Sequence, residues 1–198
     1  MYSHLYGNAL VRLNENMFNE SNYLRLLTLH DNALKSLQDG VFNGLGHLNE
    51  LYLYGNQLST LNESIFKELI SLNLLVLHTN KLKSLPSNLF KGLVHLTGLR
   101  MAVNQLITLH ESIFDDLVSL NLLSLHNNKL KVLYAGLFNG LRKLNELSLT
   151  DNLLTELDSN LFDDLENMRT LLLSQNKLIS LYNGVFTNCN NLKYLFLE

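Results

Sequence analysis

The stretch LYLYGNQLSTL, residues 51 to 61, alternates leucine with tyrosine and then reaches an asparagine. Its first two leucines stand two residues apart, which is the period of a β-strand with one apolar face. Tyr52 and Tyr54 occupy the alternate positions, so they face away from the leucines. The stretch therefore predicts a short strand that buries leucine on one side and displays tyrosine on the other, before the chain turns at Asn56.

The asparagine of this stretch recurs every 24 residues along the whole chain, and no insertion interrupts the period. It stands at Asn8, Asn32, Asn56, Asn80, Asn104, Asn128, Asn152 and Asn176. A phenylalanine keeps the same period from Phe18 to Phe186, and the units follow the pattern LxxLxLxxNxLxxLxxxxFxxLxx with few departures, such as Ser3 and Cys189 at leucine positions. A single unit cannot bury its own apolar side, so the units are expected to stack as a solenoid.

Stacking places the LxL strands side by side in a parallel sheet whose leucines face a shared core. The predicted fold is an α/β right-handed solenoid of about eight or nine short strands, bent into a horseshoe with loops or short helices on its convex face. The asparagine amides can both donate and accept, so we expect a ladder of them to satisfy the backbone where each strand turns. The phenylalanines predict a second ladder. No linker divides residues 1–198, which are expected to form one domain.

The repeat pattern resembles that of the leucine-rich repeat family, in the 24-residue form of animal extracellular proteins. Toll-like receptor ectodomains, lamprey variable lymphocyte receptors and amphioxus leucine-rich-repeat-only proteins have this form. One copy of the pattern is filled by Leu72, Leu75, Leu77, Asn80, Leu82, Leu85, Phe90 and Leu93. The resemblance implies an extracellular, secreted or ectodomain module of innate-immune type. Family members usually carry cysteine-rich caps, whereas this chain has a single cysteine, Cys189, which is expected to be a buried thiol.

The composition and the motifs that are absent argue against several classes of function. The net charge of −3 gives no argument for nucleic acid, so no nucleic-acid partner is expected. No apolar run approaches the roughly 20 residues that cross a bilayer, so no membrane span is expected. Phosphate-loop, zinc-protease and serine-hydrolase motifs are absent, and we expect neither an enzyme nor a cofactor.

Three positions in each repeat, the residues six, four and two before the asparagine, point away from the leucine core; we call them the concave face. They hold five of the eight tyrosines and four of the seven histidines, and no lysine. This composition is typical of a binding surface, although tyrosine also favours strands for its own reasons. The predicted ligand-binding residues are His30, Glu50, Tyr52, Tyr54, Val76, His78, Arg100 and His126. The expected ligand is a protein, or a microbial glycolipid or glycan.

The concave histidines His30, His78 and His126 share one column, two repeats apart. At that spacing their side chains start roughly 9–10 Å from one another, so a shared metal ion is not expected. A pH-sensitive surface stays open as an alternative. Duplication explains the spacing well, because residues 72–85 closely match residues 120–133.

The outermost repeats carry apolar residues that no further repeat covers within the chain, which predicts self-association through an end as a homodimer. The residues concerned are Leu5, Leu10, Leu192, Leu195 and Leu197. Two functional alternatives remain beside recognition of a ligand. One is an adhesion or structural self-assembly module, and the other is an intracellular scaffold or inhibitor.

Overall fold

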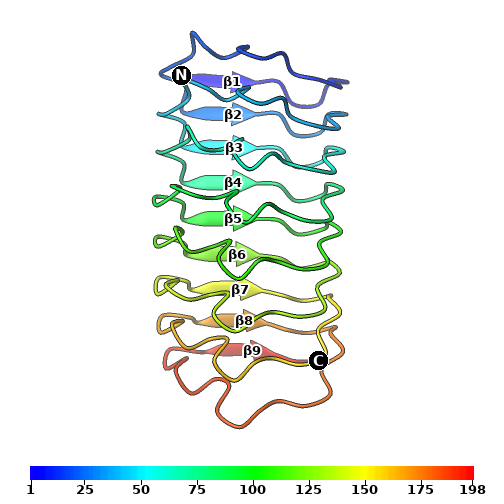
Figure 1. The fold of residues 1–198 in the computed structure, drawn as a ribbon, viewed down its shortest axis with the longest axis vertical. Helices are drawn as coiled ribbons and strands as arrows, with labels where there is room; N and C mark the ends of the chain where they lie inside the picture. Colours follow the sequence, from blue (N-terminus) through cyan, green and yellow to red (C-terminus); the bar gives the residue numbers. More distant parts are fainter.

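The computed structural model describes residues 1–198, and nine short strands make up all of its regular secondary structure. They stack along the longest axis of the molecule, one strand per coil (Figure 1). Their bounds are β1 Tyr2–His4, β2 Leu26–Thr28, β3 Glu50–Tyr52, β4 Leu74–Val76, β5 Gly98–Arg100, β6 Leu122–Ser124, β7 Glu146–Ser148, β8 Thr170–Leu172 and β9 Tyr194–Phe196.

All nine strands form one parallel sheet in sequence order, from β1 to β9. Each residue pairs with the residue 24 positions on, as Leu27 pairs with Leu51 and Leu51 with Leu75. Because no repeat carries an insertion, every coil lies in the same register on the one before it. The predicted parallel solenoid is confirmed.

The leucines and phenylalanines of all coils meet in one core cluster of 54 buried residues. Along its far side the phenylalanine rings from Phe42 to Phe186 stack on their neighbours with centroids 5.9 to 6.4 Å apart. This is the predicted second ladder. It ties each coil to the next by ring-to-ring packing in addition to the sheet.

The asparagines form the expected hydrogen-bond ladder, and each one joins two coils. The Nδ2 of Asn56 donates to the carbonyls of Leu53 and Tyr54 in its own coil and to Leu29 in the preceding coil, at 3.0 to 3.3 Å. Its Oδ1 accepts from the backbone N–H of Leu34, also in the preceding coil, at 3.1 Å. The amide thereby satisfies backbone groups that leave the sheet when the strand turns.

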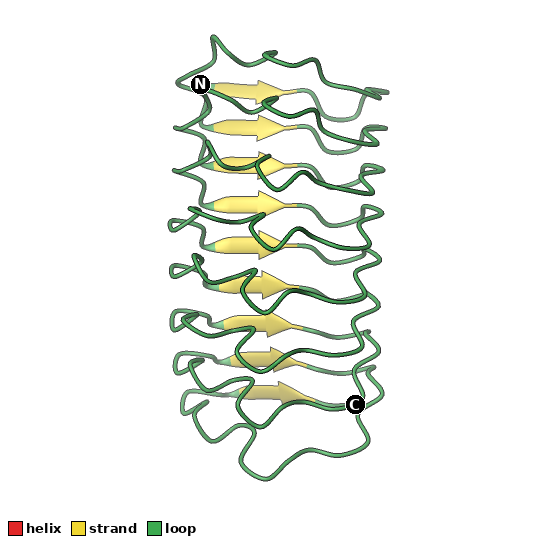
Figure 2. Cartoon of the chain, viewed as in Figure 1, coloured by secondary structure: helices red, strands yellow, loops and turns green.

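The convex side was expected to hold loops or short helices, and the structure has turns there and no helix (Figure 2). Its segments are successive turns whose N–H groups donate to the third residue back, as Val41 donates to Gln38 and Asn43 to Gly40. Gly40 and Gly44 adopt left-handed φ angles of 77° and 80°, which interrupt any helix between them. The molecule has strands and turns only, and it contains no helix that could span a membrane.

The residue before each ladder asparagine adopts a left-handed conformation in every coil. Gly7 and Gly55 fill this position in two coils, and the other six coils place side chains there. Their φ angles lie between 53° and 57°, at Asp31, Thr79, Val103, Asn127, Asp151 and Gln175. A β-branched residue such as Val103 is strained in this conformation.

The ends of the chain and its single thiol complete the fold. Leu5, Leu10 and Leu192 pack partly against the core, whereas Leu195 and Leu197 are 37% and 43% exposed. Self-association through these residues stays a prediction.

Cys189 is buried as predicted, and burial is the main cause that raises the pKa of its thiol to about 11.

Candidate ligand-binding face

A continuous stack of aromatic rings crosses the first four coils of the concave face. Tyr6, His30, Tyr54 and His78 occupy the same position in successive coils, two residues before each asparagine. Their ring centroids lie 4.6, 4.3 and 4.5 Å apart, and adjacent planes differ by only 6° to 16°. We call these four rings the aromatic ladder. The in-register sheet produces it, because neighbouring strands stand about 4.8 Å apart, close to the spacing of stacked rings.

Tyr52 braces the aromatic ladder from the adjacent column. Its ring meets His30 and Tyr54 edge-on, with centroids 6.3 and 6.4 Å apart. Its hydroxyl donates a hydrogen bond to the carboxylate of Glu50 at 2.7 Å. Burial and this hydrogen bond raise the pKa of Tyr52 to about 12, so the phenol stays protonated and its ring is held in place.

The two imidazoles of the aromatic ladder have lowered pKa values. Burial is the largest cause for both His30 and His78, and Arg100 and His126 also contribute at His78. Since the ordinary pKa of histidine is about 6.5, both rings are neutral at pH 7. The Nδ1 of His30 is buried and has no hydrogen-bond partner. The idea of a pH-sensitive face stays a prediction.

Beyond His78 the concave face changes character, because β5 and the turn after it supply two very small residues and one cation. Gly98 and Ala102 flank Arg100, which is exposed and forms no ion pair. A depression of about 340 Å³ lies over Ala102, and another of about 500 Å³ lies over Gly98. A Cβ at Gly98 would lie 2.8 Å from the Leu74 side chain, so any larger residue at this position would have to displace Leu74. Both depressions include Arg100 in their walls.

The structure brings most of the predicted ligand-binding residues together. Those of β2 to β4 and the turns after them lie in or beside the aromatic ladder, and Arg100 and His126 border the depression over Ala102. Val76 is the exception, because it is only 2% exposed and offers a ligand little contact area. Tyr6 and Ala102 were not among the predicted site residues. Their place in the same 24-residue column as His30 is the signal that could have identified them.

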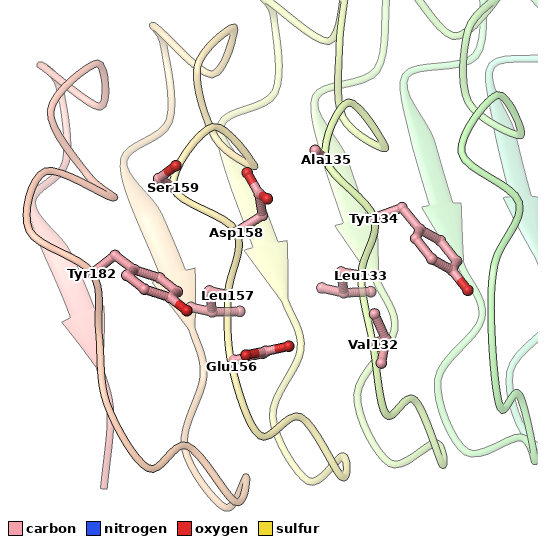
Figure 3. A pocket seen from close by; sticks show the side chains of 9 residues that line it. All are labelled: Val132, Leu133, Tyr134, Ala135, Glu156, Leu157, Asp158, Ser159 and Tyr182. Atoms are coloured by element: carbon pink, nitrogen blue, oxygen red, sulfur yellow. The ribbon is translucent and has the colours of Figure 1, made fainter.

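The surface outside the concave face holds further depressions and no cluster of metal ligands. No group of three or more histidine, cysteine or carboxylate side chains is close enough to hold a metal ion. A third depression, of about 280 Å³, lies on the loops that follow the asparagines rather than on the concave face. Figure 3 shows Glu156 and Asp158 between Tyr134 and Tyr182 in its walls.

Comparison with known proteins bears on what such a face does. A family profile described as "Leucine rich repeat" matches residues 4–58, 22–77, 99–154 and 142–198. No curated protein matches the chain. Among solved structures, a chain of the Toll–Spatzle complex of Drosophila aligns with 31% identity and a TM-score of 0.91 over 100% of this chain. A leucine-rich-repeat protein of Leptospira interrogans aligns with 31% identity and a TM-score of 0.88 over 98% of it.

The TLR13–ssRNA13 complex is a further match, with 33% identity and a TM-score of 0.82 over 88% of this chain. The chain spans 26% of the matched chain in the Toll complex, 25% of that in the TLR13 complex and 48% of the Leptospira protein. The match in an RNA complex means that the expected absence of a nucleic-acid partner, based on net charge, is not supported. The Leptospira interrogans match also means that the likeness in fold is not confined to animal proteins.

Proposed function

Because the chain belongs to the leucine-rich repeat family, we propose that it is a non-enzymatic recognition module whose concave face binds a protein ligand. The observation that carries this proposal is the aromatic ladder of Tyr6, His30, Tyr54 and His78. Stacked rings present a rigid, partly apolar surface that loses little conformational entropy on binding. Tyrosine and arginine are, with tryptophan, the residues that most often dominate the energy of protein interfaces.

The setting of the module is part of the proposal. The likeness to a chain of the Toll–Spatzle complex, which is described as a hub of development and innate immunity, supports an extracellular, immune-type role. Since this chain spans only 26% of that chain, the activity of the whole receptor does not transfer with the likeness. A microbial glycan or glycolipid is the alternative ligand. The exposed lysines beside the sheet, such as Lys81, Lys83 and Lys129, would then contact its anionic groups.

The test starts from binders selected out of an array of extracellular protein domains. Each binder is then measured against Tyr54→Ala, Arg100→Ala and, as the matched control on the convex side, Asp115→Ala. Hot-spot truncations cost roughly 2 kcal/mol, so each concave substitution is expected to weaken binding about 30-fold. The control is expected to change binding by less than about twofold. Binders lost with Asp115→Ala and kept by both concave variants would refute the proposal.

Self-assembly as an adhesion module is distinguished by the same variants. If two copies met through the concave face, Tyr54→Ala would lower the mass measured by light scattering at micromolar concentration. We expect it to leave that mass unchanged, because the proposed ligand of this face is another protein.

A further inference from the structure

The aromatic ladder lacks one ring. Its column continues beyond His78 with Ala102 and then with His126. Ala102 is only 4% exposed, and its methyl group forms the floor of the depression of about 340 Å³. His78 and His126 stand at opposite sides of this depression, so the column holds an imidazole, a gap one coil wide and another imidazole.

The gap has the thickness of one aromatic ring. Rings in adjacent coils of this column lie 4.3 to 4.6 Å apart, so rings two coils apart are separated by about 9 Å. Offset-stacked rings prefer centroid distances from about 4.5 Å upward. A planar ring inserted above Ala102 would therefore sit at stacking distance from both His78 and His126. It would restore the spacing found in the first four coils.

Hydrogen bonds hold the two imidazoles beside the gap. The Nδ1 of His78 is 2.9 Å from the hydroxyl of Thr79, and the Nδ1 of His126 is 2.9 Å from the hydroxyl of Ser124. These two side chains are therefore already ordered before a ligand ring binds, and the entropic cost of ordering them on binding is small. Arg100 lies in the wall of the same depression as an exposed cation without an ion pair, and Glu146 lies there as a hydrogen-bond acceptor.

We infer that this gap receives an aromatic side chain of the protein partner, next to a carboxylate of that partner which pairs with Arg100. The inference rests on the proposed function and specifies the chemistry that the concave face recognises. The charges of the face favour a protein over RNA. Its charged residues are Glu50, Arg100, Glu146 and Glu198, with no lysine, whereas RNA binding depends on neutralising several phosphates.

The test uses N-acetyl-L-tyrosine, which joins an aromatic ring to a carboxylate, as the probe. Histidine ring protons are followed by NMR, and their signals are assigned with His78→Gln and His126→Gln. A ligand of this size is expected to bind with a dissociation constant on the order of 1 mM. Ring-current shifts should be confined to these two histidines. N-acetyl-L-leucine, which lacks the ring, should bind at least tenfold more weakly.

Two substitutions in the same column provide the decisive comparison. Ala102→Tyr fills the gap with a residue that this column already holds at Tyr54, so it is expected to fold, with an unchanged or raised Tm, and to weaken probe binding at least tenfold. Thr150→Tyr adds the same ring outside the gap, beyond His126, and should leave binding within twofold. Arg100→Gln should remove the preference for N-acetyl-L-tyrosine over its uncharged amide.

The outcomes separate this inference from the proposed function. Undiminished probe binding by Ala102→Tyr, or equal binding of the leucine analogue, overturns the inference. So does uridine 5′-monophosphate binding more tightly than N-acetyl-L-tyrosine, which would make a nucleobase the occupant. If selected protein binders are weakened by Tyr54→Ala but not by Ala102→Tyr, only the gap is refuted. If the probe binds in the gap while binders ignore every concave substitution, the proposed function fails and the protein partner of the gap fails with it, and the gap is then a site for a small aromatic carboxylate.

Discussion

Replacing Asn104 by leucine tests whether the asparagine ladder holds the coils together. Its Nδ2 donates to the carbonyls of Leu77, Met101 and Ala102 at 3.1 to 3.2 Å, and its Oδ1 accepts from the N–H of Leu82 at 3.0 Å. An amide has two hydrogens, so these contacts amount to about three hydrogen bonds, worth roughly 1 kcal/mol each.

The four backbone groups that bond to Asn104 differ in whether they keep another hydrogen-bond partner in Asn104→Leu. Each of the three carbonyls keeps another donor, as the carbonyl of Leu77 keeps the Nδ2 of Asn80 at 3.0 Å. The buried N–H of Leu82 loses its acceptor, which adds a penalty of about 1–3 kcal/mol. Burial of the apolar leucine side chain offsets part of this loss. Asn104→Leu is therefore expected to lower the free energy of unfolding by about 3–5 kcal/mol.

Asn8 provides the matched control, because it holds the same position in the first coil. It is exposed and its side chain makes two hydrogen bonds, to the carbonyls of Leu5 and Tyr6. Water can replace both, so Asn8→Leu should cost less than about 1 kcal/mol. Urea denaturation followed by circular dichroism measures both variants. A loss below 1 kcal/mol for Asn104→Leu, or equal losses for the two, would refute the ladder's role in stability.

Three more predictions concern other parts of the array. Phe114→Ala should cost about 3–5 kcal/mol in urea denaturation, whereas Phe186→Ala, which is half-buried and stacks on one side only, should cost less; equal costs would contradict the phenylalanine ladder. Val103→Asn should stabilise the protein by about 1 kcal/mol, because asparagine tolerates the left-handed φ of 53° better than valine; an unchanged or lower Tm would show that this backbone is not strained. The pKa values of His30 and His78 are lowered in the folded state, so the free energy of unfolding should be fully present above pH 6.5 and fall as the pH drops below it. The urea midpoints at pH 7.5 and pH 5.5 should therefore differ less in His78→Gln than in the unchanged protein. An equal pH dependence of the two proteins would contradict the lowered pKa of His78.

The repeat pattern predicts the fold almost completely, because the residues that build it are the same in every coil. The asparagine and phenylalanine columns indicate which positions turn, which are buried and which strands pair. The convex side was less predictable, because its turns depend on backbone conformations such as those of Gly40 and Gly44. The spacing of residues there does not separate a series of turns from a short helix.

The concave face was predictable in outline only. Tyrosine and histidine enrichment indicated the concave columns, and Tyr54 was among the predicted ligand-binding residues, but the spacing did not indicate that its ring stacks between two imidazoles. Tyr6 and Tyr54 alternate with His30 and His78, and only the exact register of the sheet shows that unlike rings form one stack. The spacing places Ala102 between His78 and His126, but a small residue becomes informative only when its neighbours in space are known.

Each strand lies across the long axis and the strands are stacked along it, and this arrangement determines how the molecule would respond to mechanical force. A pull on the two termini acts along the direction in which β1 to β9 are stacked, so it opens one interface between coils at a time (Figure 1). Each detached coil releases 24 residues, or about 80 Å of extended chain at roughly 3.4 Å per residue. Since adjacent coils are joined by nearly the same contacts, the array would lengthen in steps of equal size as the coils detach one after another.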